Sequence, residues 1–242
     1  MSKNAFIIKC VLLSAVCSVP AMAQDTFKDY GFIGGGLTVG ESVFSNEGTK
    51  AGAEPYLFYN SDKGFIDGSL FNYNPIPYVG ITGNLRVAEV SDDFDNIPNG
   101  INDRDGNGEL GITLGTVGAR LTYLHDVTDE HNGYEIQAHF GRAYEMPLKG
   151  LVFAPYVEVN YRDNKLSEHL YSISAQESSA SGLAAFDADD AWVYKGGVVT
   201  LYNMSDRWVA ISEISLEHHD SNSPLVQNDL GWAFSFGAAY TF

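Results

Sequence analysis

Apolar and polar residues alternate along most of the chain with a period of two. In 151–162 the odd positions from Leu151 to Tyr161 are apolar, whereas the even positions include Glu158, Asn160 and Arg162. Side chains point alternately to the two faces of a β-strand, so this pattern indicates a strand between an apolar and a polar medium. The same alternation recurs in 78–87, 133–144, 207–218 and 228–242.

The alternation and the turn residues between such segments divide the chain into strands. We predict strands at 30–39, 49–60, 64–73, 78–89, 109–116, 119–126, 133–145, 150–162, 191–203, 207–219 and 228–242, with a weaker one at 165–173. Alternating segments of about ten residues separated by turns are typical of membrane barrels. We therefore expect an all-β fold, an antiparallel transmembrane β-barrel of about 10–12 strands.

A soluble β-barrel or β-sandwich also alternates, and two features weigh against it. The face of the last strand opposite Trp232 and Phe242 carries only small or weakly polar residues, which suit a lumen better than a soluble exterior. Aromatic residues also gather near strand ends, as the interfacial girdles of membrane barrels require. They are Tyr30, Phe71, Tyr73, Tyr134, Tyr144, Tyr161, Tyr171, Trp192, Tyr202 and Trp208.

Three connections are long and acidic, namely 91–108, 163–190 and 219–228. Long loops of such barrels normally face outward, and short turns face the periplasm. Consecutive strands of such a barrel run in alternating directions through the membrane. If 91–108 and 174–190 both face outward, the strands predicted in the N-terminal third do not fit this alternation. One strand in the N-terminal third is therefore miscounted.

The first residues form a secretory signal peptide. Lys3 and Lys9 give a positive start, an apolar run follows, and Ala21-Met22-Ala23 is a small-x-small cleavage signature. We expect a signal peptide at 1–23, cleavage near Ala23, a barrel domain at 24–242 and a location in the outer membrane of a Gram-negative cell. A lipoprotein would use Cys17, but the bulky Val16 precedes it.

Composition narrows the possible partners. The chain of 242 residues carries 14 Lys and Arg against 31 Asp and Glu, a formal charge of −17. Such an acidic chain lacks the basic face that nucleic acids require. Both cysteines, Cys10 and Cys17, lie in the signal peptide, so the mature chain has no disulfide, thiolate nucleophile or Cys-ligated metal. We predict no cofactor.

The segment 103–108 resembles the start of a calcium-binding loop. With Asp103 as position one of the loop, Asp103, Asp105 and Asn107 supply oxygen atoms at positions one, three and five, and Gly108 is at position six. Position twelve is Leu114, where a bidentate Glu is needed, and strands rather than helices flank the segment. A polar surface turn is the favoured interpretation, with a weak calcium site as the alternative.

Ser212, His218, His219 and Asp220 contain the residue types of a hydrolase. Ser212 and His218 are six residues apart on one predicted strand, about 20 Å at 3.3 Å per residue, so they form no local triad. We predict no catalytic residues.

Charged residues of both signs fall on the predicted inner faces of the strands. They are Arg86, Arg120, Glu135, His139, Glu158, Arg162, Lys195, Glu213 and Glu217. This mixture indicates a lumen crossed by ion pairs, which is closed or very narrow, with a selective pore as the alternative.

Several segments resemble the MipA/OmpV family of outer-membrane proteins. The longest is Tyr171 to Asp187, which carries Glu177, Ser181, Gly182 and Leu183 at the family's positions. The loop from Asp220 to Val226, with Ser223 and Pro224, resembles the family's D-S-P-x-V element. Other matches are Gly100 to Arg104, Asp126 to Gly133, Asp206 to Trp208 and the ending Gly237 to Phe242. Phe186 and Gln227 depart from the pattern.

The resemblance implies an outer-membrane barrel that acts as a non-enzymatic scaffold. The member that gives the family its name binds a murein lytic transglycosylase and links it to a murein synthase, and other members are described as adhesins. The expected partners are therefore outer-membrane lipid, lipopolysaccharide, these murein enzymes and the barrel-assembly machinery, for which Phe236, Tyr240 and Phe242 resemble the recognition signal. A narrow porin or a surface adhesin is the alternative function.

Overall fold

The computed structural model describes residues 29–93 and 95–242, so the predicted signal peptide and its cleavage site lie outside the described residues. The strands are β1 (Tyr30–Glu41), β2 (Lys50–Ser61), β3 (Gly64–Asp67), β4 (Leu70–Ile76), β5 (Val79–Arg86), β6 (Asn107–Thr116), β7 (Ala119–Asp126), β8 (Tyr134–Gly141), β9 (Tyr144–Glu145), β10 (Leu151–Arg162), β11 (Ala191–Asn203), β12 (Trp208–Asp220) and β13 (Gly231–Thr241). Helices α2 (Asn164–Tyr171) and α3 (Ala175–Ser181) lie between β10 and β11. No helix among the described residues is long and apolar enough to cross a bilayer.

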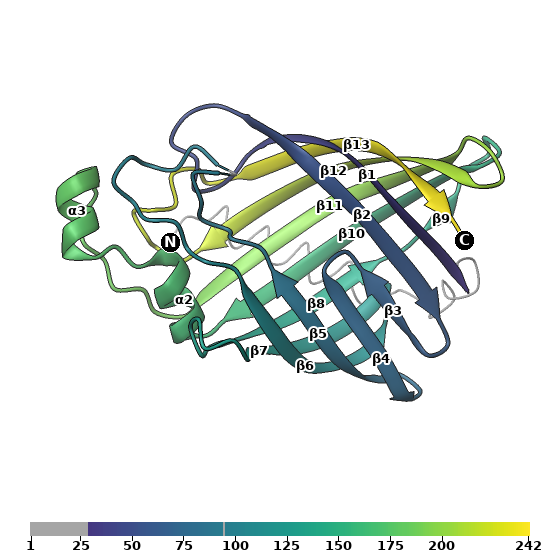
Figure 1. Ribbon diagram of the computed structural model, residues 1–242, viewed down its shortest axis with the longest axis horizontal. Coiled ribbons are helices and arrows are strands. Elements are labelled where there is room, and N and C mark those ends of the chain that lie inside the picture. Colours follow the sequence, from purple (N-terminus) through teal and green to yellow (C-terminus); the bar gives the residue numbers. More distant parts are fainter. Residues whose placement is uncertain (1–28, 94) are drawn as a thin grey trace, which may run out of the picture.

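Antiparallel pairing closes the sheet on itself. Neighbouring strands pair in sequence, β13 pairs with β1, and β10 pairs with β11 (Figure 1). β8 and β9 pair with successive parts of β10, so together they occupy one place in the wall. The described residues therefore form a 12-stranded antiparallel barrel, as the alternation predicted. Where neighbouring strands overlap, this pairing satisfies the backbone hydrogen bonds that lipid cannot.

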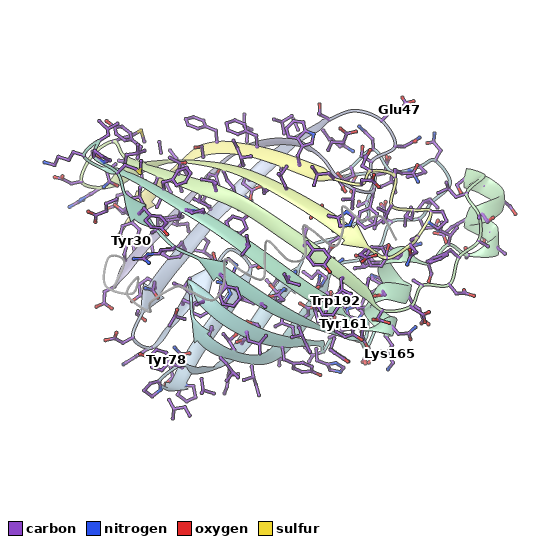
Figure 2. All side chains as sticks on the ribbon, turned by 180° about the vertical axis from the view of Figure 1, so that it is seen from behind. Tyr30, Glu47, Tyr78, Tyr161, Lys165 and Trp192 are labelled. Atoms are coloured by element: carbon purple, nitrogen blue, oxygen red, sulfur yellow. The ribbon has the colours of Figure 1, made fainter. Side chains whose placement is uncertain are left out.

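The apolar faces of the strands point out of the barrel (Figure 2). Leu37, Ile81 and Phe236 are 74%, 62% and 58% exposed, whereas Ser235 and Ala239 on the other face of β13 are buried. A soluble barrel would have the opposite arrangement, because its apolar side chains fill the interior. The small face of β13 lines the lumen, as predicted.

Aromatic residues cluster at both ends of the wall. The rings of Tyr161 and Trp192 are 5.2 Å apart at one end, and those of Trp208 and Tyr240 are 5.8 Å apart at the other. Two residues that we predicted in these girdles lie elsewhere. Tyr171 is fully buried at the end of α2, and Tyr30 packs against the apolar cluster inside the barrel.

Two of the predicted strands are wrong. The single strand at 64–73 is the hairpin of β3 and β4, with the turn at Gly68 and Ser69. The weak strand at 165–173 is mostly α2. The carboxylate of Asp163 caps this helix by accepting a hydrogen bond from the Leu166 amide, and Leu166 and Leu170 bury one face at helical spacing.

The extra strand resolves the order of loops and turns. The described parts of the connections 42–49, 87–106, 127–133, 163–190 and 221–230 all lie at one end of the barrel, which we call the loop end (Figure 1). Turns 62–63, 77–78, 117–118, 146–150 and 204–207 lie at the opposite turn end, together with Phe242. Among the described residues, the β3–β4 turn lies partway along the wall because these strands are short, as does the connection 142–143 between β8 and β9.

Candidate functional site

Four loops at the loop end pack into a common core, and we call them the cap. They are the described parts of 42–49, 87–106, 163–190 and 221–230. Their buried apolar residues form one cluster with Ala191, the first residue of β11. The loop residues of this cluster are Val43, Phe44, Val90, Ile97, Ile101, Leu166, Leu170, Tyr171, Ile173, Ala188 and Leu225. The cap is therefore a packed layer over the barrel mouth, with about 1.5–3 kcal/mol of burial energy for each large side chain.

Helix α3 is built from the predicted family residues. Ser174 and Glu177 form a capping box at its start, the Ser181 hydroxyl donates to the Glu177 carbonyl, and Gly182 ends it in the left-handed conformation. The Glu177 carboxylate also lies 2.8 Å from Arg104 and accepts from the Asn102 amide. The Tyr171–Asp187 segment therefore joins the Gly100–Arg104 segment across the cap.

The loop after β12 joins the same core. Asp220 is the last residue of β12, opposite Trp192. The Ser223 hydroxyl donates to the Tyr171 carbonyl at 2.6 Å, and the Pro224 carbonyl accepts from Gln227. Leu183 and Val226 pack against the buried cluster. The structure thus brings the predicted family residues together as parts of the cap.

A layer of buried ion pairs crosses the lumen beneath the cap. Arg86 pairs with Glu89 at 2.6 Å, Glu109 at 3.0 Å and Glu135 at 3.3 Å. Arg162 pairs with Glu89 at 2.9 Å and with Glu135 at 2.8 Å. We call these five residues the lumen network. Burial opposes ionisation of Glu89, but Arg162 and Arg86 outweigh it and hold the pKa of this loop carboxylate well below its usual range.

Tyr171 connects the lumen network to the cap. Its hydroxyl accepts from Arg162 Nη1 at 2.6 Å and lies 3.0 Å from Nδ1 of His219. The rings of Phe44 and His219 pack against the Tyr171 ring. Burial raises the pKa of Tyr171, so the hydroxyl stays protonated and can donate to the histidine.

A polar cavity of about 400 Å³ lies in the lumen beside this network. Glu158, Asn160, Lys195 and Glu217 line it from the strands, and Asp95 lines it from the cap. Lys195 lies 3.6 Å from Glu217, and Glu158 lies 3.1 Å from His139. The predicted ion pairs of the lumen are confirmed. Burial raises the pKa of Asp95 to about 6.

Apolar side chains fill the lumen nearer the turn end. The cluster consists of Phe32, Tyr56, Val152, Leu201, Val209, Ile211 and Ala239, with Tyr30 and Phe58 packed against it. The rings of Phe32 and Phe58 stack 5.3 Å apart. The polar cavity is therefore bounded by the cap on one side and by this apolar cluster on the other.

The proposed calcium ligands serve other contacts. The Asp103 carboxylate accepts from the Asp92 amide at 2.8 Å, and Asn107 begins β6 with its amide 3.4 Å from Asp126. The backbone carbonyl of Asp105 lies 3.1 Å from His169. No group of three His, Cys, Asp or Glu residues that could hold a metal occurs in the described part of the chain.

Sequence reasoning missed Glu89 and Glu109, two acids of the lumen network. Glu109 follows the alternation of β6, in which Leu110 and Ile112 point outward, so the pattern could have revealed it. Glu89 comes from a loop, where no period assigns a direction. His219 was considered only as part of a hydrolase, but it lies buried against Tyr171, and His218 bonds to the Asp229 carbonyl instead.

Comparison with known proteins gives relatives that match nearly the whole chain and others that match about half of it. YiaT of Escherichia coli O157:H7 and of strain K12, named as an outer membrane protein, is 26% identical over 245 residues, which cover 94% of this chain and 97% of YiaT. The MltA-interacting protein of E. coli K12 is 26% identical over 126 residues, 51% of this chain and 50% of that protein.

Among solved structures, the outer membrane protein OprG from Pseudomonas aeruginosa aligns over 90% of this chain and 98% of its own, with 13% identity and a TM-score of 0.29. A likeness this low supports no argument. The family comparison is decisive, because the model described as MltA-interacting protein MipA matches residues 33–242, which include the cap and all of the barrel except the first residues of β1. This outer-membrane β-barrel therefore belongs to the MltA-interacting protein MipA family.

Proposed function

We propose that this protein is a non-enzymatic scaffold that holds a murein lytic transglycosylase at the turn end of its barrel. Murein enzymes work in the periplasm, and short turns of outer-membrane barrels face that side. A related chain carries the name MltA-interacting protein. The arginines of the lumen network are held in ion pairs with its carboxylates, which supports a structural role for them rather than a catalytic one.

The observation that carries this proposal is an apolar patch on two adjacent turns. Met146, Leu148 and Met204 are 41%, 61% and 52% exposed at the turn end. Their turns are joined by a hydrogen bond from the Asn203 amide to the Gly150 carbonyl, beside a cavity of about 440 Å³. Exposed apolar groups with a polar rim are typical of protein interaction sites.

Binding of the purified barrel in detergent to a purified lytic transglycosylase tests the proposal. We expect the double variant Leu148→Glu, Met204→Glu to bind about tenfold more weakly or worse, since charges would enter the apolar contact. Leu230→Glu is the matched control, because Leu230 is 53% exposed at the loop end. Absence of binding by the native barrel, or equal loss in the control, would overturn the proposal.

A narrow channel is the second candidate, and the polar cavity favours it. The apolar cluster around Phe32 and Ile211 would have to move before ions could pass. Conductance in planar bilayers separates the two functions, with a steady silent bilayer at high protein load expected for the scaffold.

A further inference from the structure

The barrel wall is interrupted between β2 and β5. β3 pairs only with Phe58–Ser61 of β2, and the amide of Gly68 bonds to the Leu57 carbonyl just beyond. On the other side, β4 pairs with β5 as far as Asn84, and the amide of Leu85 bonds to the Ser69 carbonyl just beyond. Beyond the β3–β4 turn, no described strand fills the interval, and the edges of β2 and β5 diverge (Figure 1).

The sequence of β2 suits an edge that remains unpaired. Pro55 lies in the unpaired part and has no amide proton for a ladder hydrogen bond, which confines proline to edges of sheets. The cap bounds the interval at its far end, where the Lys50 ammonium donates to the backbone carbonyls of Asp92 and Asp95. The interval is therefore a window with defined borders.

The polar cavity of the lumen reaches this window. It is lined by Glu135 and Arg162 from inside the barrel, by Ser69 at the hairpin tip, and by Leu85 and Val87 of the outer face. Leu85 and Val87 are 63% and 64% exposed. Ser69, Leu85 and Val87 all belong to the border of the window. Since outward apolar residues mark the lipid belt, these lining residues place the cavity next to the lipid-facing border of the window.

The cations of this cavity are already engaged. Arg86 and Arg162 belong to the lumen network, Arg120 lies 2.8 Å from Asp67, and Lys195 lies near Glu217. The lining carboxylates outnumber these cations; they are Asp67, Glu89, Asp95, Glu135, Glu158 and Glu217. A further positive charge is therefore favoured over a further negative one.

Asn160 supplies an acceptor without a partner. It is 1% exposed, and its amide nitrogen donates to Glu158 at 2.9 Å, which leaves Oδ1 buried and unbonded. A buried acceptor in this state costs about 1–3 kcal/mol, which a donor from a ligand would recover. An ammonium group offers three donors and the charge that Glu158 complements.

We propose that the cavity binds the head of an amphiphile that carries an ammonium group, held by Asn160 Oδ1 and Glu158, and that its apolar tail leaves through the window between β2 and β5 into the membrane. The volume lies within the range of small-ligand sites. This binding site is independent of the turn-end patch proposed for the murein enzyme.

Photocrosslinking in proteoliposomes tests the site. The probe is dodecylamine with a diazirine in the middle of its chain, and the comparison is dodecanoic acid with the same diazirine. We expect the amine to label the window borders, 51–57, 67–70 and 85–87, about tenfold more than the acid does. Excess unlabelled dodecylamine should abolish this labelling in the native chain. Equal labelling by both probes, or labelling spread evenly over the outer face, would overturn the proposal.

Two variants test the binding of the ammonium head and the exit of the apolar tail separately. Asn160→Leu removes the free acceptor and Ser69→Trp narrows the window, so each should reduce labelling by the amine to the level of the acid. Asn203→Leu at the turn end is the control and should label like the native chain. Heat-dependent migration on gels verifies folding, and should a variant not fold, the competition in the native chain decides. If a folded Asn160→Leu barrel were labelled by the amine as strongly as the native chain, Asn160 would not bind the ammonium group and the proposal would be refuted.

Discussion

Nε of Arg162 lies 2.8 Å from Oε2 of Glu135, and each of these side chains is only 1% exposed. The two residues stand opposite each other in the pairing of β10 with β8. Arg162 also donates to the Tyr171 hydroxyl, so one guanidinium connects the barrel wall, the lumen network and the cap. The stability of wall and cap should therefore depend on the same side chain.

Replacement of Arg162 by Met should strongly destabilise the barrel. The change leaves the Glu135 carboxylate buried with less compensation, and breaking a buried pair costs about 3–5 kcal/mol. Urea unfolding of the refolded barrel in detergent measures this loss. Lys195→Met is the control, because Lys195 is 34% exposed and 3.6 Å from its partner, and it should cost less than about 1 kcal/mol. Equal costs would contradict this account.

Tyr171→Phe should loosen the cap while the wall stays closed. The variant keeps the ring in the apolar cluster but removes the hydroxyl that Arg162 and His219 share. Loss of this buried group should cost about 1–3 kcal/mol and speed amide exchange in α2. Tyr202→Phe, on the outer face of β11, should leave exchange in α2 unchanged.

The attachment of α3 should weaken in acid. Burial opposes ionisation of Glu177, but Arg104 and the amides of Ser174 and Asn102 lower its pKa from 4.5 to about 2. Since the folded pKa is the lower one, the stabilisation is complete above pH 4.5 and is lost as pH falls toward 2. Amide protection of 174–182 should fall across this window. Glu177→Gln should remove that dependence, and an unchanged profile in the variant would contradict it.

The loop 127–133 should respond to pH in a different window. Burial lowers the pKa of His131 from 6.5 to about 4. The charge of Asp126 acts in the opposite direction and raises this pKa, whereas His169 lowers it further. The neutral ring accepts a hydrogen bond from the Gly133 amide at 2.9 Å. Its stabilisation is complete above pH 6.5 and is lost as pH falls toward 4. Amide exchange should show this loss, and His131→Asn should flatten it.

Gly100→Ala should separate α3 from the loop 87–106. Gly100 has φ +89°, and a Cβ there would lie 2.7 Å from the Ala180 carbonyl carbon. Gly48→Ala is the matched control, since Gly48 has φ +71° but no neighbouring atom within 4 Å of the new Cβ. The control should cost about 1–2 kcal/mol from its backbone alone. Proteolysis of the cap should be faster in Gly100→Ala than in the control.

Much of the wall could be predicted because alternation is a local property. β10 and β13 follow it over their full length, so their lipid-facing and lumen-facing residues could be assigned in advance. The hairpin of β3 and β4 was missed although Asp67, Gly68 and Ser69 are turn residues, because its strands have only 4 and 7 residues and are shorter than the segments of about ten residues expected of a barrel. Helix α2 was mistaken for a strand because Leu166 and Leu170 have even spacing, which fits both periods.

The cap shows the limit of sequence reasoning. Its segments were recognised as family motifs, but their roles come from contacts between residues far apart in the chain. The amide of Asn102 reaches Glu177 from 75 positions away, and Arg162 reaches Glu89 from 73. Single-sequence patterns have no period at such separations, so the partners emerge only when the closed barrel brings the loops together.

The sequence by itself determined the membrane barrel, because a strand between lipid and a polar lumen must alternate at every second residue. It also determined that charges of both signs face inward. Only the tertiary structure decided how those charges pair, that the loops form a packed cap, and that the short β3–β4 hairpin leaves a window beside the cavity. These features depend on the distances between segments that are far apart in the chain. Strand lengths and closure of the barrel set those distances, and the local order of residues does not reveal them.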